Sequence, residues 1–153
     1  MKALSVWPEW AMPIMLGQKT VECRSWPTSH SGPLLVCSSA RKADGCVCGH
    51  AICVVNLVRV EPYGPEHDQF SMLDFGCVPE RSFAWVLDGV KMVRPFPVRG
   101  SQRLFDVPDG LVEVLGEPSR RLVERHILPI VHRSRNSEAD EIWSEVFDSL
   151  GWL

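Results

Sequence analysis

The sequence lacks any uninterrupted apolar run long enough to span a bilayer, which excludes a transmembrane helix. Its opening stretch, MKALSVWPEW, has neither the long apolar region nor the small-residue cleavage site of a secretory signal. Internal repeats and low-complexity segments are also missing, which excludes a repeat architecture. We therefore expect a soluble, cytoplasmic protein that makes no contact with a membrane.

The sequence also lacks the paired metal-ligand motifs that are typical of zinc sites. The stretch GCVCGHAIC places Cys46, Cys48 and His50 on one side of an extended chain, but a closed zinc site needs four ligands, usually with a second pair elsewhere. Without a secretory signal, the six cysteines are expected to be free thiols rather than disulfides. The sequence thus predicts no metal and no cofactor.

A strong positive charge is the third absence, because the net charge is −3. This total argues against a strongly basic nucleic-acid binder. The charge is unevenly distributed, however. Residues 136–153 contain five acids and no Lys or Arg, whereas residues 89–105 contain four basic residues and no acid, and residues 120–135 contain five arginines and two histidines. Two local basic segments therefore remain.

The length of 153 residues and the 45% hydrophobic content indicate one core. A short helix is predicted over residues 8–16, ended by Gly17. The strand candidates are rich in Val, Leu and aromatic residues, and they favour an antiparallel barrel, with HAICVVNLVRV as the central strand. These candidates are KALSV, residues 20–24, PLLVCSS, HAICVVNLVRV, FAWVL, VKMVR, RLFDV and LVEVL.

After Gly116 the pattern becomes helical. SRRLVERHI and SEADEIWSEVFDSLG both show helical periodicity, and the second carries an apolar stripe. Ser137 and Asp140 resemble a capping box, and Gly151 is placed to end this helix. We predict a barrel domain over residues 1–115 and a helical extension over residues 116–153 that packs on it. The stripe consists of Ile142, Trp143, Val146, Phe147 and Leu150.

The stretch GQKTVECR concentrates charged residues directly after Gly17. On an extended chain, alternation places Glu22 and Arg24 on one face and turns Thr20 away from Lys19. Gly17-x-Lys19-x-x-Glu22-x-Arg24 resembles the GxKxxExR motif of the ASCH domain, a relative of the PUA RNA-binding barrel. The segments LSVWPEWA, RSW, FAWVL and VRGSQRLFDV are similar to further parts of that family, so the resemblance covers about residues 3–108.

The resemblance implies an α+β fold: a PUA-like antiparallel β-barrel with flanking helices, whose cleft carries the motif. We expect Lys19 to face this open cleft and to contact phosphate or a base edge, and Arg24 offers a planar fork for phosphate. Glu22 has alternatives: it pairs with Lys19 or Arg24, or accepts from a base. Trp10 and Trp26 bracket the motif and are candidates for stacking on a base, and Arg94 and Arg99 are candidates for phosphate contacts.

Members of this family differ in activity: some bind nucleic acid, some resemble ribonucleases, and some are amidohydrolases acting on N4-acetylcytidine. The amidohydrolases resemble GxKxxTxR, where the threonine is the nucleophile, but this chain has Glu22 there, so that mechanism does not transfer. A hydrolase would instead need Glu22 to activate water while Lys19 stabilises an oxyanion. We expect binding of RNA or a nucleotide, and a hydrolase remains the alternative.

The C-terminal segments leave two further alternatives open. The arginine-rich residues 120–135 either extend a nucleic-acid surface or pack on the acidic helix that follows. The tryptophan-containing helix near the C-terminus either completes the fold or docks a partner, which includes a second copy of the chain in a homodimer.

Overall fold

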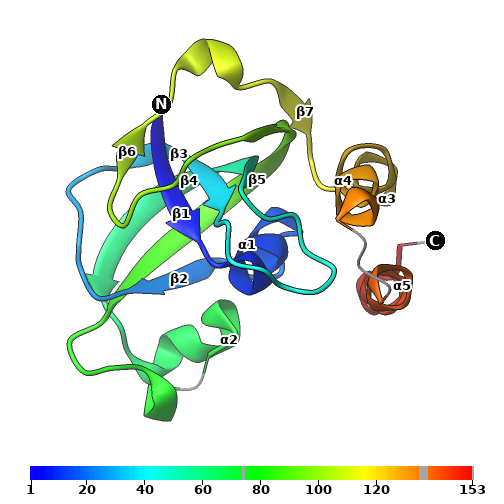
Figure 1. Ribbon diagram of the computed structural model, residues 1–153. Helices are drawn as coiled ribbons and strands as arrows, with labels where there is room; N and C mark the ends of the chain where they lie inside the picture. Colours follow the sequence, from blue (N-terminus) through cyan, green and yellow to red (C-terminus); the bar gives the residue numbers. More distant parts are fainter. Residues whose placement is uncertain (74, 135–137, 153) are drawn as a thin grey trace.

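The computed structural model describes residues 1–73, 75–134 and 138–152, and one mixed sheet organises it (Figure 1). Its strands follow the order β2-β5-β4-β3-β1-β6, and β7 pairs with the far end of β5. Every pairing is antiparallel except that of β1 with β3, which is parallel. The strands are β1 (Lys2–Val6), β2 (Val21–Arg24), β3 (Gly32–Ser38), β4 (His50–Pro62), β5 (Phe83–Pro97), β6 (Phe105–Asp106) and β7 (Val114–Gly116).

Two long strands, β4 and β5, form the middle of the sheet. The prediction that HAICVVNLVRV is an interior strand is confirmed, because β4 lies between β3 and β5. FAWVL and VKMVR, two separate candidates in the sequence, join into the single strand β5, which passes through Gly89 at φ +61°. Three register shifts between β4 and β5 mark bulges, and bulges bend a strand and increase its twist. The bent sheet wraps around its own core.

The predicted closed barrel is wrong, because the sheet is open. Within the residues that the structure describes, no ladder joins its two edge strands, β2 and β6. Both edge strands are short, since β2 has four residues and β6 has two. Pro27 follows the end of β2 by three residues and Pro108 follows the end of β6 by two, and neither proline has an N–H with which to extend its ladder.

The first helix, α1 (Pro8–Met15), matches the prediction, and Gly17 follows it at φ +81°. Proline at the first helical position needs no N–H partner, and glycine supplies the left-handed turn that returns the chain to the sheet. Between β4 and β5 the chain forms the short helix α2 (Asp68–Ser71), flanked by 3₁₀ turns at Pro65–His67 and Phe75–Cys77. A further 3₁₀ turn, Asp109–Leu111, precedes β7.

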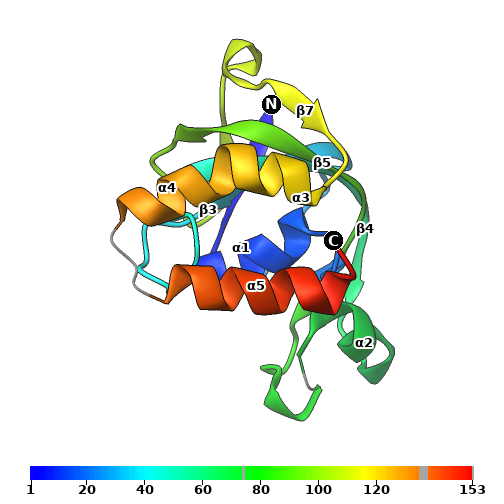
Figure 2. The same ribbon diagram turned by 90° about the vertical axis from the view of Figure 1, so that its right-hand side faces the viewer.

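The C-terminal segment folds into two antiparallel helical arms beside the sheet (Figure 2). The first arm is continuous and consists of α3 (Arg120–Leu122), a π-helical turn (Val123–Ile127) and α4 (Leu128–Arg133); the second is α5 (Ala139–Leu150). Gly151 ends α5 at φ +68°, as predicted, whereas the proposed capping role of Ser137 lies outside the described residues. No helix in the described ranges is long and apolar enough to cross a bilayer.

These arms share one hydrophobic cluster with the sheet. Val123, Ile127 and Trp143 are buried in the same cluster as Leu4 and Trp85. The indole Nε1 of Trp143 also donates to the carbonyl of Gly45 at 2.7 Å, which ties α5 to the loop before β4. The boundary at residues 115 and 116 stays a prediction, since the packing is continuous across it.

Polar and cation–π contacts add to the hydrophobic cluster that the arginine-rich arm shares with the acidic helix. His132 Nε2 lies 2.6 Å from Asp140 Oδ1, and the Arg120 guanidinium lies 4.6 Å from the centroid of the Phe147 ring. Arg121 and Arg125 are exposed, and neither has an ion pair among the residues that the structure describes. Intramolecular packing therefore accounts for part of the arm, and Arg121, Arg125 and Arg133 face solvent.

Candidate nucleic-acid interface

Lys19 is buried, with an exposed fraction of 2%. Its ammonium group donates to the carbonyl of Ser71, lies 3.7 Å from Glu22 Oε1 and lies 5.0 Å from the centroid of the Trp10 ring. Burial lowers the pKa of Lys19 below its ordinary value of 10.5, and the negative charge of Glu22 opposes that shift. The cation is thus enclosed by a carboxylate, a carbonyl and an aromatic face.

Glu22 is the centre of the motif, and both of its carboxylate oxygens have partners. Oε1 accepts from the backbone N–H of Cys23 at 3.0 Å and faces Lys19, while Oε2 lies 3.4 Å from Arg24 Nη1. The same Arg24 nitrogen donates to the carbonyl of Ser5 on β1 at 3.3 Å. The motif therefore joins α1, β2 and β1 through one carboxylate held between two cations.

The expectation that Lys19 faces an open cleft is wrong, because the segment before β5 covers it. Thr20 donates its backbone N–H to Phe70 at 2.9 Å, and the hydroxyl of Tyr63 bonds both Asp68 Oδ1 and Ser71 Oγ. These bonds hold α2 against the start of β2, as Figure 1 shows. The segment that covers Lys19 lies some fifty residues later in the chain, so the residues of the motif could not predict that Lys19 is covered.

A hollow of about 260 Å³ adjoins Lys19 on the side of α1 and β5. Thr20 and Lys19 both line it. β2 begins at Val21, so strand alternation does not fix the direction of the Thr20 side chain, and the expectation that it turns away from Lys19 stays a prediction. The remaining lining is largely apolar and consists of Ile14, Gly17, Val55, Leu87, Asp88, Gly89 and Val90.

Trp26 forms the outer part of the motif region, beside Arg24. The guanidinium carbons of Arg24 and Arg103 lie 5.7 and 5.2 Å from the centroid of its ring, within cation–π range. Trp85 fixes the ring from below: their centroids are 4.8 Å apart at an interplanar angle of 84°, and Trp85 Nε1 donates to the Trp26 carbonyl at 3.2 Å. We call Arg24, Trp26 and Arg103 the motif face.

Arg103 is a residue that the sequence did not single out. It belongs to the basic segment 89–105, from which Arg94 and Arg99 were chosen instead. Its segment lies against β1, because a Cβ added at Gly100 would come within 2.1 Å of Ser5 Oγ. Arg103 of this segment lies over the same Trp26 ring as Arg24, and Arg99 of the same segment is exposed.

Arg94 is not part of the motif face. It lies at the far end of β5, where it makes a bidentate ion pair with Glu113 at 2.6 and 3.3 Å. β2 pairs with β5 only from Phe83 to Val86, and the intervening residues put Arg94 about 25 Å along the strand at 3.3 Å per residue. The structure thus separates Arg94 from the motif.

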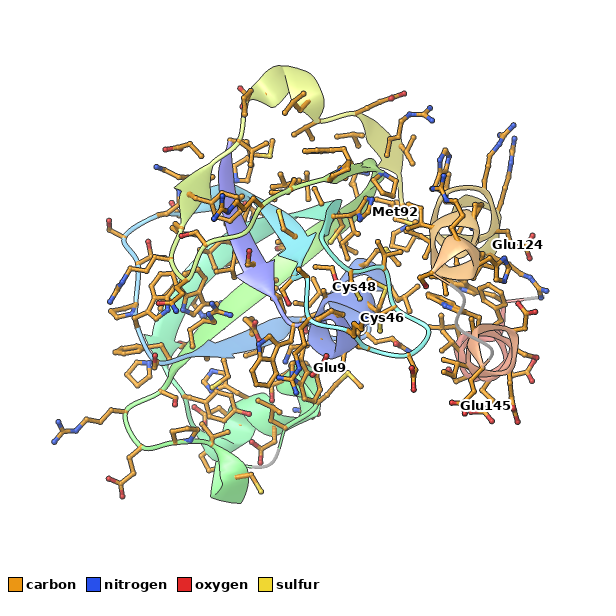
Figure 3. The ribbon with its side chains drawn as sticks, in the orientation of Figure 1. Glu9, Cys46, Cys48, Met92, Glu124 and Glu145 are labelled. Atoms are coloured by element: carbon orange, nitrogen blue, oxygen red, sulfur yellow. The ribbon has the colours of Figure 1, made fainter. Side chains whose placement is uncertain are left out.

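The cysteine-rich stretch, GCVCGHAIC, lies next to the start of α1. Cys46 and Cys48 project from the loop before β4, and Cys46 lies beside Glu9 (Figure 3). Burial, reinforced by negative charge nearby, raises the pKa of Cys46 to about 12. His50 Nδ1 donates to the carbonyl of Cys48 at 2.9 Å. In the described ranges, no three potential metal ligands come together, and all six cysteines are free thiols.

Comparison with known proteins agrees with this architecture. The model of the ASCH domain matches residues 4–96, and no curated protein matches the sequence significantly. The crystal structure of ASCH from Zymomonas mobilis superposes with a TM-score of 0.57 at 18% identity, covering 71% of this chain and 88% of that one.

Two mutants of the Zymomonas mobilis protein have also been solved. A serine-to-alanine mutant gives a TM-score of 0.59 at 16% identity, covering 73% of this chain and 96% of that one. A tyrosine-to-phenylalanine mutant gives a TM-score of 0.57 at 18% identity, covering 71% of this chain and 90% of that one. At such identities the likeness shows the fold alone, but the family model covers more than half of the sequence. The chain therefore belongs to the ASCH domain family.

Proposed function

We propose that this ASCH domain binds single-stranded RNA or a nucleotide at the motif face. The observation that carries the proposal is the placement of two guanidinium groups, from Arg24 and Arg103, within 6 Å of the Trp26 ring. Aromatic rings stack on unpaired bases, and guanidinium forks bind phosphate through two parallel hydrogen bonds. Membership of the ASCH family points to nucleic-acid binding at the same coarse level.

The charges at the motif face favour an anionic ligand. Glu22 compensates Arg24, whereas Arg103 is exposed and has no ion pair among the described residues. A ligand phosphate would supply the missing partner of Arg103. Arg99 is exposed on the same segment, and we expect it to contact the next phosphate along a strand.

Lys19 and Glu22 support this face from beneath. Both are buried, so we assign them the role of holding Arg24 and Trp10 in position rather than that of touching the ligand. Trp10 is half-buried beside the Lys19 ammonium, and it is a second ring on which we expect a base to stack.

The hydrolase alternative would require movement. Glu22 has a partner on each oxygen and a side chain that is 6% exposed, so a water molecule could reach it only if the segment carrying Ser71 moved away. Binding needs no such movement, which is why we favour it. A cytoplasmic location and a homodimer through the C-terminal helices stay predictions; the apolar stripe of α5 already packs within its own chain.

The test is a titration of a fluorescent, short single-stranded RNA against the wild type, Arg103→Gln and the matched control Arg59→Gln. Arg59 is an exposed arginine on β4, outside the motif face. We expect Arg103→Gln to weaken binding by about 1.5–3 kcal/mol, the usual contribution of a hydrogen bond to a charged group, and Arg59→Gln to bind as the wild type does. Equal affinity of the wild type and Arg103→Gln would remove the motif face from the binding site. Shortening of the RNA would favour the hydrolase.

A further inference from the structure

A second hollow, of about 640 Å³, lies between the far end of β5 and the first helical arm. Its lining combines cationic side chains from two parts of the chain with a leucine floor. We call it the basic groove; its lining residues are Arg94, Leu115, Ser119, Arg121, Leu122, Arg125 and His126. It lies at the opposite end of β5 from the motif face, so it is a separate surface.

The groove is built by the junction of β7 with the helical arm. Buried Met92 of β5, labelled in Figure 3, pairs with Gly116 of β7, and the chain then turns into α3. Ser119 begins that helix, because its hydroxyl accepts from the backbone N–H of Leu122 at 3.2 Å. The π-helical turn at Val123–Ile127 follows at once. Such turns are rare and occur frequently at functional sites.

The acids nearby leave the groove positive. Arg94 donates to the Glu113 carboxylate through Nε and Nη2. Arg120 Nε lies 2.5 Å from Glu124 Oε1 on the outer side of the arm (Figure 3). Arg121 and Arg125 are exposed and have no ion pair in the part of the chain that the structure describes.

The titration of His126 reflects this positive charge. Burial lowers the pKa of His126, and the charges of Arg94 and Arg125 lower it further, against the opposing effect of Glu113. The potential in the groove therefore repels a further proton and attracts an anion.

We propose that the basic groove binds the sugar-phosphate backbone of a single-stranded nucleic acid. Two unpaired guanidinium groups suit phosphate, which they contact through paired hydrogen bonds. The hollow is much larger than a phosphate ion, and the leucine side chains of its floor give a sugar an apolar surface. Two of the three arginines that line the groove, Arg121 and Arg125, lie beyond residues 4–96, so this surface comes largely from the C-terminal extension rather than from the matched ASCH region.

The experiment measures the affinity of a fluorescent oligouridylate for the full chain at several salt concentrations. The test variant is Arg121→Gln with Arg125→Gln, and the matched control is Arg133→Gln, an exposed arginine on the same arm outside the groove. Thermal melts check that each variant folds. We expect the double variant to bind at least tenfold more weakly. The slope of log K against log salt should become shallower by about 1.4, since each lost phosphate contact on a single strand removes about 0.7. The control should keep the wild-type affinity and slope.

Three outcomes would overturn the proposal: a double variant with wild-type affinity, an equal loss in Arg133→Gln, or competition by inorganic phosphate as effective as competition by the unlabelled oligomer. The last outcome would indicate a site for free anions only. Arg103→Gln in the same assay separates this inference from the proposed function. Loss in the groove variant with no loss in Arg103→Gln supports the groove and contradicts the motif face, and the reverse contradicts the groove.

Discussion

At the scale of single residues, the central feature is a carboxylate shared by two cations. Glu22 receives Lys19 on one oxygen and Arg24 on the other, and the three side chains connect a helix end to two strands. A buried ion pair is costly to break, because the remaining charge loses its partner in a poorly solvated site. The motif thus acts first as a clasp, and the ligand-binding groups surround it.

Lys19→Ala should lower the free energy of unfolding by about 3 kcal/mol, toward the lower end of the range for breaking a buried pair, because Arg24 still compensates Glu22. The RNA affinity of the folded variant should fall by less than that of Arg103→Gln, because Lys19 positions Trp10 but does not touch the ligand. Urea unfolding monitored by tryptophan fluorescence measures the first quantity. Lys91→Ala, the same change at an exposed position on β5, is the control and should alter stability by less than about 0.5 kcal/mol. A stable Lys19→Ala variant whose binding is weakened as much as that of Arg103→Gln would show that Lys19 touches the ligand.

The motif residues show what could and could not be predicted from the sequence for single residues. The motif identified the charged residues correctly, since residue type and spacing carry that information. It could not show that Lys19 is buried, because the cover comes from Phe70 and Ser71, distant in sequence. It also missed Arg103, because a loop has no periodicity from which the direction of a side chain can be read.

At the scale of elements, the docking of α5 depends on the loop before β4. Gly45 has φ +72°, and a Cβ added there would lie 3.0–3.4 Å from atoms of Ile142. Its carbonyl accepts from Trp143. This glycine is therefore required both for the turn and for the close approach of the helix.

Gly45→Ala should destabilise the protein more than Gly49→Ala does. Both glycines have positive φ, +72° and +75°, but a Cβ at Gly49 would meet no atom within 4 Å. Gly49→Ala therefore measures the cost of backbone strain alone. The additional loss of unfolding free energy in Gly45→Ala measures the clash with α5, and we expect it to be about 1–3 kcal/mol, as in overpacked cores. Chemical unfolding measures both changes. Adding Ile142→Ala to Gly45→Ala should recover part of the difference; equal destabilisation by the two glycine substitutions would show that α5 does not pack tightly on this loop.

The helices and strands were easier to predict from the sequence than the contacts between them. Alternating or continuous apolar runs identified β1, β3, β4 and α5, because those patterns follow directly from burial on one or both faces. Closure of the sheet could not be read in this way. It depends on the pairing of two edge strands distant in sequence, β2 and β6, and no local pattern shows whether they pair.

At the scale of the whole molecule, cationic side chains gather at two surfaces despite the net charge of −3. The exposed acids of α5 include Glu141, Glu145 and Asp148, while the motif face and the basic groove lie at opposite ends of β5. Two separated cationic surfaces suit one extended polyanion better than a small ligand.

The most direct measurement follows the six tryptophan indole N–H signals by NMR while single-stranded RNA is added to protein labelled with ¹⁵N at tryptophan. Trp26→Phe assigns the signal of Trp26, and Trp143, buried and hydrogen-bonded to Gly45, serves as the internal reference. We predict that the Trp26 signal shifts in proportion to the bound fraction while that of Trp143 stays in place. An unchanged Trp26 signal at saturating RNA would contradict binding at the motif face.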